Sequence, residues 1–387
     1  MARTPIPDPR PVRAFLDERH PDVAADLDAW SRRELSPRPE PADDAAARVE
    51  ARAILRLLGD AGRLEPIRSG DFRAISLTRE ALGATSPLAD AVFALQALSV
   101  LPILASGNDA MMKRWVDDSI AGLAMGAFAM TEPEAGSDVA ALATTARRDG
   151  ADYVLDGTKR FISNAGIADF YVVFASTDPT AGGKGISCFV VPADARGLSF
   201  TGAQVMAAPH PLGEIALRGC RVPAVQRLGE EGRGFALGLK TLDRLRATVG
   251  AAACGMAARA LVEAIEHART RKQFGKRLAD FQLIQEKLAR MAADLTAARL
   301  LVYRAAWEAD RDTARITLES SMAKAFATEA AQRVVDDAVQ VLGGAGVLAS
   351  HPVDRLYRSV RSLRIYEGTT EILELVVASQ LLREADA

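Results

Sequence analysis

Cysteine, histidine and aromatic residues are all scarce in this chain of 387 residues. The three cysteines, Cys188, Cys220 and Cys254, lie far apart and show no CxxC spacing, which predicts buried free thiols instead of a metal site or a redox pair. Only four histidines occur, and no two of them have the helical or short-loop spacing of a zinc site. A metalloenzyme is therefore not expected.

Net charge and long apolar runs are also missing. Forty-eight Lys and Arg against fifty Asp and Glu leave a formal charge of -2, so nothing global steers the chain toward nucleic acid or an anionic membrane. No stretch of eighteen apolar residues occurs, and the N-terminal MARTPIPDPRPVR has prolines and charges where a signal peptide needs an apolar run. We expect a cytoplasmic protein in which any anion site is local.

A change in hydrophobic period divides the chain into three parts, and 387 residues that are 49% apolar can bury the cores of two or three domains. The pattern predicts a loosely ordered arm up to about residue 45 around a short helix near residues 13–31, then helices up to about residue 106. Strands follow after Phe128, and helices begin again from Gly234. The expected fold is α+β and multidomain, with helices, then an antiparallel β domain, then a helical bundle. The predicted domains are 1–126, 127–232 and 233–387.

Turn signals and side-chain spacing locate elements within these parts. Asp149-Gly150 and Asp156-Gly157 predict two hairpin turns, and the segments around them predict strands at 152–155, 159–163, 170–175, 186–192 and 214–217. One predicted helix packs in a bundle along a seam of Ile284, Leu288, Met291, Leu295, Ala298 and Val302. Residues 247–260 are mostly Ala and Gly, which lets backbones approach closely. A helix over 316–342 should end at Gly343-Gly344 in a left-handed cap.

Five segments carry residues suited to chemistry. Residues 129–138, AMTEPEAGSD, form either a cradle for a polar ring edge or phosphate or simply a loop with good turn chemistry. In residues 159–164 the aromatic Phe161 and the hydroxyl residue Ser163 are two positions apart, so their side chains lie on the same face of a strand. The basic turn 271–276 could hold a pyrophosphate, although alone it would indicate a helix-end arginine in water. Gln340 with Gly343-Gly344, and residues 365–371, complete the set.

In this order and spacing, the five segments resemble those of the acyl-CoA dehydrogenase family over residues from about 45 to 383. The resemblance implies an N-terminal α-helical domain, a middle β domain and a C-terminal four-helix bundle, with FAD between the last two. It also implies a homo-oligomer, expected to be a tetramer, that passes electrons to electron-transferring flavoprotein. The substrate is expected to be an acyl-CoA thioester and the product its trans-2-enoyl thioester.

The resemblance assigns site residues position by position. The isoalloxazine and the near phosphate are expected to contact Phe128, Met130, Thr131 and Ser137, with Phe161 against the ring and the Ser163 hydroxyl near flavin N5. The pyrophosphate and adenosine half, reached from a neighbouring subunit, is expected to contact Arg271, Gln273, Phe274, Gln282, Gln340, Gly343 and Gly344. Further cofactor contacts are Thr369 and Glu371, and the acyl-CoA is expected at Ser137, Asp243, Arg246 and Gly368.

Glu367 matches the family's catalytic base. Some branches place this carboxylate immediately before Arg246, but that position is Leu245 here, which cannot act as a base. Thr369-Thr370-Glu371 predicts a helix start just after Glu367, so a mere helix-end role is the alternative. A positive helix end should lower the Glu367 pKa and a dry acyl pocket should raise it.

The chain departs from many relatives at residues 205–213, where two prolines bracket His210. His210 could touch the substrate, but we expect a surface-loop histidine and do not include it in the site. Three alternatives to the dehydrogenase remain open: an acyl-CoA oxidase, a dehydrogenase of carrier-protein thioesters, and a non-catalytic scaffold. Glu367, Arg271 and Gly343-Gly344 argue against the scaffold.

Overall fold

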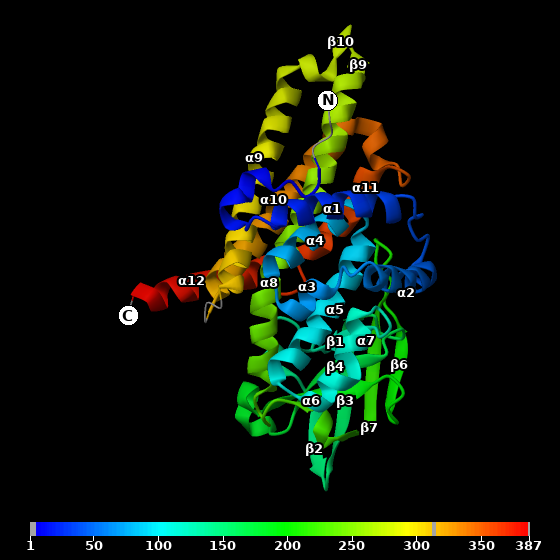
Figure 1. The fold of residues 1–387 in the computed structure, drawn as a ribbon, viewed down its shortest axis with the longest axis vertical. Coiled ribbons are helices and arrows are strands. Elements are labelled where there is room, and N and C mark those ends of the chain that lie inside the picture. Colours follow the sequence, from blue (N-terminus) through cyan, green and yellow to red (C-terminus); the bar gives the residue numbers. More distant parts are fainter. Residues whose placement is uncertain (1–4, 312–314, 386–387) are drawn as a thin grey trace. The chain divides into compact units, whose positions relative to one another are not determined.

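The computed structural model describes residues 5–311 and 315–385, which form two compact units. Each unit is assembled from segments that are distant in the sequence. Helices, then strands, then helices follow one another along the chain, as the changes of period predict (Figure 1).

Unit 1 comprises the chain up to Pro39, Asp71–Asp90 and the chain from Asp243 onward. It takes in the first turn of α5 (Pro87–Ser106) and most of α8 (Gly234–Thr270). Its other elements are η1 (Arg10–Phe15), α1 (His20–Glu34), α4 (Phe72–Thr85), β9 (Lys272–Gln273), β10 (Lys276–Arg277), η6 (Leu278–Asp280), α9 (Gln282–Asp310), α10 (Thr317–Leu342), η7 (Gly343–Val347), α11 (Pro352–Leu363) and α12 (Thr370–Ala385).

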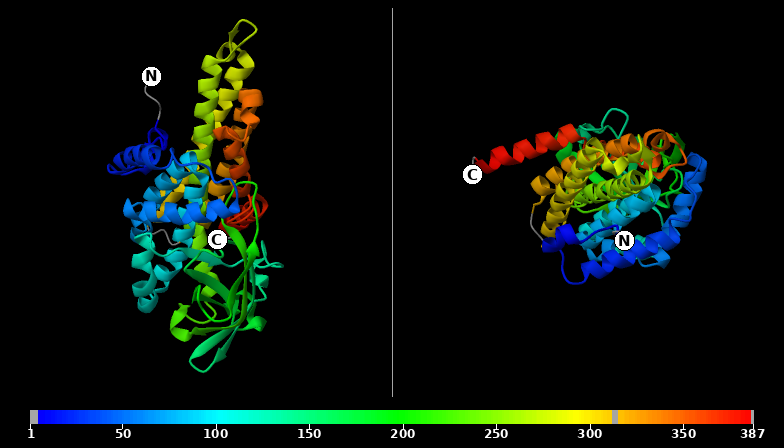
Figure 2. Two further views of the ribbon diagram at one scale, coloured as in Figure 1. Left: turned by 90° about the vertical axis from the view of Figure 1, so that its right-hand side faces the viewer. Right: turned by 90° about the horizontal axis from the view of Figure 1, so that it is seen from above.

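The core of unit 1 lies among α8, α9, α10 and α11, the helices of the predicted C-terminal bundle, and takes in side chains of α4, α1 and η1. Within it α9 and α10 pack against each other, in yellow and orange in Figure 2. The predicted seam of α9 is confirmed: its last four residues are buried, and Ile284 and Leu288 pack against them from partly buried positions. Gly343 ends α10 with φ +60° and ψ −137°, so its φ is positive as predicted, but its ψ lies outside the left-handed helical region.

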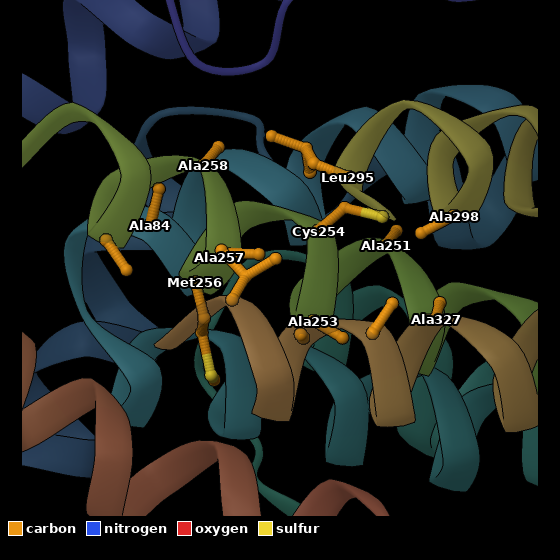
Figure 3. Close-up of a cluster of buried hydrophobic side chains, with 14 of the residues drawn as sticks. Ala84, Ala251, Ala253, Cys254, Met256, Ala257, Ala258, Leu295, Ala298 and Ala327 are labelled. Atoms are coloured by element: carbon orange, nitrogen blue, oxygen red, sulfur yellow. The ribbon is translucent and has the colours of Figure 1, made fainter. Parts of the chain in front are cut away.

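Small residues let α4 and α8 pack with their backbones close together. A Cβ at Gly255 would lie 2.0 Å from the Glu80 carbonyl oxygen, and one at Gly83 would lie 2.6 Å from the Ala252 carbonyl oxygen. Around them, alanines such as Ala253 and Ala257 fill the core (Figure 3). The Ala- and Gly-rich segment is therefore a packing feature, as predicted.

The short helix expected near residues 13–31 is present as α1, but the expectation of a loosely ordered arm around it is wrong for the residues that the structure describes. Val12 in η1 and Leu27 in α1 are buried in the core of unit 1. The turn η1 packs on α9, and α1 packs on α4. Apolar side chains spaced among the prolines and charges make this segment a part of the core, since their burial offsets the entropy of ordering it.

Unit 2 comprises Glu40–Gly70 and Ala91–Leu242. Its helical elements besides parts of α5 and α8 are α2 (Asp44–Asp60), α3 (Glu65–Ser69), α6 (Asp109–Met111), the π-helical turn η2 (Met112–Val116), α7 (Asp117–Ile120), η3 (Val139–Ala141), η4 (Pro179–Gly185) and η5 (Ala224–Gln226). Its strands are β1 (Gly126–Ala129), β2 (Thr145–Asp149), β3 (Asp152–Ser163), β4 (Phe170–Ser176), β5 (Ile186–Pro192), β6 (Leu198–Ala203), β7 (Leu212–Pro223) and β8 (Arg227–Leu228).

These strands form one sheet in the order β6-β7-β3-β2-β4-β5-β8, with β1 pairing alongside β4. Neighbours are mainly antiparallel, as predicted, although β1 and β2 pair with β4 in parallel. The turn predicted at Asp156-Gly157 is wrong, because β3 runs through it with a register shift between Leu155 and Gly157. A Cβ at Gly157 would lie 2.3 Å from the Thr144 hydroxyl oxygen, so the glycine permits a close contact here instead of a reversal.

Cys188, Cys220 and Cys254 are free and buried, which confirms the prediction of buried thiols. Within the described residues, α5 and α8 are long and apolar enough to cross a membrane, but 72% of each apolar window is buried inside the chain. Burial of that kind is typical of core helices in soluble proteins.

Candidate active site

Glu367 lies in the short connection between α11 and α12, and its backbone is strained. Its φ is +55°, a conformation that costs a non-glycine residue free energy, and the next residue, Gly368, has a φ of +100°. Directly afterwards the Thr369 hydroxyl accepts a hydrogen bond from the Ile372 N–H at 3.3 Å, which confirms the predicted cap of α12. Strain of this kind persists where surrounding contacts impose it, and it often marks a functional position.

Two cationic side chains hold the backbone of this connection. Arg246 Nε donates to the Glu367 carbonyl oxygen at 3.3 Å, and Lys324 Nζ donates to the Gly368 carbonyl oxygen at 2.6 Å. Arg246 is itself paired with the Asp243 carboxylate, which accepts a second hydrogen bond from the Thr317 hydroxyl at 2.6 Å. Asp243 therefore holds Arg246, and Arg246 in turn holds the backbone of Glu367.

The Glu367 side chain is enclosed and unsatisfied. Its Oε2 is buried and has no hydrogen-bond partner among the described residues. Burial raises the pKa of Glu367, while the positive charges of Arg79, Arg246 and Lys324 oppose that rise and Asp90 reinforces it. The predicted rise of the Glu367 pKa on burial is confirmed, whereas the lowering expected from the helix end stays a prediction. Such a carboxylate is suited to accept a proton near neutral pH.

A buried ion pair next to Glu367 was not predicted from the sequence. Arg79 on α4 and Asp90 on α5 are almost fully buried and form a two-pronged contact at 2.8 and 2.9 Å. A further Arg79 nitrogen donates to the Thr248 hydroxyl at 3.0 Å. The available signal was a charge in an otherwise apolar segment, since Asp90 opens the run that becomes α5.

In unit 2, the predicted flavin-facing residues lie at the end of β3. Phe161 is 56% exposed and has a φ of +56°, so an aromatic ring is presented to solvent on strained backbone. The Ser163 hydroxyl lies 2.7 Å from Nε2 of His210. The expectation of an uninvolved surface histidine is therefore wrong: His210 contacts a predicted site residue, a pairing across 47 positions that local sequence does not show.

A buried ion pair between the loop 129–138 and β3 anchors the loop. Lys159 Nζ contacts Glu132 at 2.7 Å and also donates to the Met130 carbonyl oxygen. Burial lowers the pKa of Lys159 to about 8. Glu132 accepts two further backbone hydrogen bonds, from the N–H groups of Ala143 and Thr144. Of the two interpretations left open for this loop, good turn chemistry is confirmed for Glu132, and the cradle stays a prediction.

Side chains next to this anchor differ in exposure. Phe128 packs on Phe174 with ring centroids 5.0 Å apart, and Met130 is buried. Thr131 is half-buried and Ser137 is exposed. The loop thus carries two accessible hydroxyl side chains, Thr131 and Ser137, next to the buried ion pair that anchors it.

The predicted pyrophosphate residues belong to unit 1 and are exposed. Arg271 follows the end of α8, and the hairpin of β9 and β10 turns at Phe274, which is 92% exposed with a φ of +50°. The other predicted residues of this group, Gln273, Gln282, Gln340, Gly343 and Gly344, are also exposed. Thr369 caps α12 and Glu371 lies exposed in its first turn.

The chain was compared with known proteins. Residues 127–220 match the acyl-CoA dehydrogenase middle domain, and residues 232–382 match the acyl-CoA dehydrogenase C-terminal domain. The probable acyl-CoA dehydrogenase fadE25 of Mycobacterium leprae is 36% identical over 375 residues, which is 95% of this chain and 96% of that protein. The chain belongs to the acyl-CoA dehydrogenase family. The predicted family and fold are thereby confirmed.

Two other similar proteins give further detail. The CarC subunit of the caffeyl-CoA reductase-Etf complex from Acetobacterium woodii is 40% identical over 290 residues, 73% of this chain and 75% of that subunit. A solved glutaryl-CoA dehydrogenase from Mycobacterium smegmatis in complex with FADH2 has a TM-score of 0.87 and 27% sequence identity, covering 95% of this chain and 96% of that one. The chain is accordingly an FAD enzyme of acyl-CoA dehydrogenation.

The residues present fit FAD. The exposed ring of Phe161 offers an aromatic face that unit 2 does not bury, and Ser163 and Thr131 offer hydroxyl groups. Arg271 offers a guanidinium of the kind that binds phosphates. A strained, exposed aromatic residue has no function in the packing of unit 2, whereas a planar cofactor would cover it.

Proposed function

We propose that Glu367 is the base that removes the α proton of a bound acyl-CoA. The observation that supports this role is the enclosed, unpartnered Oε2 of a carboxylate whose pKa is raised by burial. FAD, when bound, would supply the acceptor for the hydride of the β carbon at its N5 atom. The proton thus goes to Glu367 and the electron pair leaves with the β hydrogen, which produces the trans-2-enoyl-CoA. No second base competes at Leu245, which is buried.

The other residues around Glu367 have supporting tasks in this proposal. Arg246 and Lys324 fix the backbone on both sides of the strained residue, so that the carboxylate is held in one place before substrate arrives. Their positive charges keep the Glu367 pKa from rising so far that the base is always protonated. The residues proposed to contact the acyl-CoA, as the resemblance implies, are Ser137, Asp243, Arg246 and Gly368.

Several finer features rest on the family and on the relatives. We propose that the reduced enzyme passes electrons to electron-transferring flavoprotein, because the CarC relative is named as part of a reductase-Etf complex. That relative, named a caffeyl-CoA reductase, also makes the saturated aryl-propanoyl thioester a candidate to test alongside straight and branched acyl-CoA, because its dehydrogenation would give the aryl-propenoyl thioester. The enzyme is proposed to be a cytoplasmic homotetramer in which exposed Arg271 and Gln340 complete the cofactor site of a neighbouring subunit.

Glu367→Gln tests the base directly, because glutamine keeps the size and cannot accept the proton. The variant should retain FAD and acyl-CoA binding, while the rate of flavin bleaching on anaerobic mixing with substrate falls about 100- to 10,000-fold. Glu374→Gln is the matched control, since Glu374 is an exposed carboxylate on the following helix. Bleaching of Glu367→Gln at the wild-type rate would show that Glu367 only supports the start of α12.

A panel of thioesters separates the dehydrogenase from its alternatives. Straight, branched and aryl acyl-CoA substrates, and an acyl-carrier-protein thioester, are mixed with the enzyme and scored with electron-transferring flavoprotein and with oxygen alone. We expect turnover with a CoA thioester and the flavoprotein, and little peroxide. Rapid peroxide production would indicate an oxidase, and exclusive use of the carrier-protein thioester would move the substrate away from CoA.

A further inference from the structure

The loop 204–211, between β6 and β7, closes onto the end of β3 at three points. The Phe161 N–H donates to Gln204 Oε1 at 2.9 Å, and the Asn164 N–H donates to the Pro211 carbonyl oxygen at 2.8 Å. Between these two contacts, the Ser163 hydroxyl meets His210 Nε2 at 2.7 Å. This is the stretch in which the sequence departs from many relatives.

These contacts lie beside an irregularity in the strand pairing. The register of β3 against β7 shifts between Lys159 and Ile162, and the pairing resumes where Ile162 and Ser163 face Gly213 and Leu212. Two residues at this end have positive φ, +56° at Phe161 and +65° at Asn164. The loop gives the Phe161 N–H, which lies within the interruption, an acceptor, and it gives the Ser163 hydroxyl a partner, so it contributes to how both residues are presented.

The base of the loop is braced by α2. Arg48 donates to the Ala165 carbonyl oxygen at 2.6 Å and to the Leu212 carbonyl oxygen at 2.9 Å. Prolines on both sides of His210 restrict its backbone further. His210 is therefore fixed from the helix side as well as from the strand side.

His210 is neutral at physiological pH. Burial lowers its pKa to about 4; the positive charge of Arg48 lowers it further, and the carboxylate of Asp44 works in the opposite direction. A neutral imidazole carries one N–H donor and one lone pair. In the tautomer that carries its proton on Nε2, His210 donates to the Ser163 hydroxyl oxygen. The hydroxyl proton of Ser163 then points away from the imidazole.

We propose that His210 is a positioning residue that orients the Ser163 hydroxyl toward flavin N5 and thereby raises the reactivity of N5 toward nucleophiles. The inference takes the placement of Ser163 beside N5 from the family resemblance, on which the proposed function also rests. A hydrogen bond from the Ser163 hydroxyl to N5 withdraws electron density from the oxidised isoalloxazine ring. Without His210 the hydroxyl rotates among several orientations, and part of this effect is lost.

Sulfite binding to the FAD-loaded protein reports N5 reactivity without any thioester. His210→Phe removes the contact, and the sulfite dissociation constant should rise about three- to tenfold, the usual worth of one hydrogen bond. The flavin reduction potential should fall in parallel. His210→Gln, which keeps an N–H donor, should recover most of the affinity. Val205→Ala on the same loop is the matched control, because Val205 is 76% exposed, and it should bind sulfite as the wild type does.

The double variant decides whether His210 acts through Ser163. Ser163→Ala alone should weaken sulfite binding, and adding His210→Phe to it should change nothing further. If His210→Phe is equally damaging in both backgrounds, or if Ser163→Ala has no effect, the proposal is wrong. If His210→Phe does not retain FAD, the smaller His210→Ala, which also lacks a donor, replaces it in the cycle. Because no thioester is used, inactivity of the enzyme toward acyl-CoA would overturn the proposed function without affecting this result.

Discussion

Asp90 and Lys324 carry charges of opposite sign near Glu367, so replacing them should shift the pKa of its carboxylate in opposite directions. Asp90 raises the Glu367 pKa through its negative charge, and Lys324 lowers it. Because Glu367 works in its deprotonated form, the rate of flavin reduction should rise with pH through this pKa. The acid limb of the pH profile, where the rate rises as Glu367 loses its proton, should therefore shift when either charge is removed.

Asp90→Asn should move the acid limb to lower pH, because it removes a negative charge and leaves the Arg79 charge uncompensated near Glu367. Removing one partner of a buried ion pair also costs about 3–5 kcal/mol of stability, so the profile should be measured well below the unfolding temperature. Asp337→Asn, in a distant pair with Lys287, is the control and should leave the limb in place. A limb that stays fixed in Asp90→Asn would contradict the role assigned to the pair.

Lys324→Met should move the same limb to higher pH. Its difference from the wild type should shrink above about pH 8, because burial lowers the pKa of Lys324 to about 8 and the wild-type side chain then loses its own charge. Stopped-flow bleaching from pH 5 to 9 measures both variants. Shifts of the two variants in the same direction would show that local distortion, and not charge, is responsible.

At the scale of elements, the approach of α4 to α8 depends on glycine. Gly255→Ala should lower the melting temperature, because its Cβ would lie 2.0 Å from the Glu80 carbonyl oxygen, a backbone atom that cannot rotate away. Such overpacking typically costs about 1–3 kcal/mol, which exceeds the gain of about 1 kcal/mol expected for Ala over Gly in a helix. Gly202→Ala, whose Cβ would meet no atom within 4 Å, is the control for thermal unfolding.

At the scale of the whole molecule, a single chain leaves large apolar side chains in water. Leu375 and Leu382 on α12 are 67% and 69% exposed, and Phe274 at the β9–β10 turn is 92% exposed. The part of α12 that carries Leu382 extends from the other helices of its unit (Figure 1). Exposed side chains of this size are compatible with the proposed tetramer.

Arg271→Glu should reduce FAD retention in the oligomer, because a negative charge would lie beside the cofactor pyrophosphate. The mass of the assembly and the flavin-to-protein ratio after gel filtration measure this effect. Arg269→Glu makes the same charge change in the last turn of α8 and should retain the cofactor. A stable monomer with full flavin occupancy would refute both the tetramer and the shared cofactor site.

Local features of the sequence were sufficient for much of the fold. The α9 seam, the strands β4 and β5, the buried thiols and the cap of α12 depend on neighbours along the chain, and each was predicted correctly. The prediction of a turn at Asp156-Gly157 was wrong because the same dipeptide also suits a strand irregularity beside Thr144. The N-terminal arm failed because its few apolar residues find a core that lies far away in sequence.

The sequence alone determined the order of the segments, the family they resemble and the identity of the candidate base. Only the tertiary structure decided what surrounds that base and the flavin-facing strand end. Arg79 with Asp90, Lys324 with Gly368, and Ser163 with His210 pair across gaps of 11 to 47 positions. Burial and partners set the pKa and the orientation of these groups, and both arise from packing between segments that no local pattern connects.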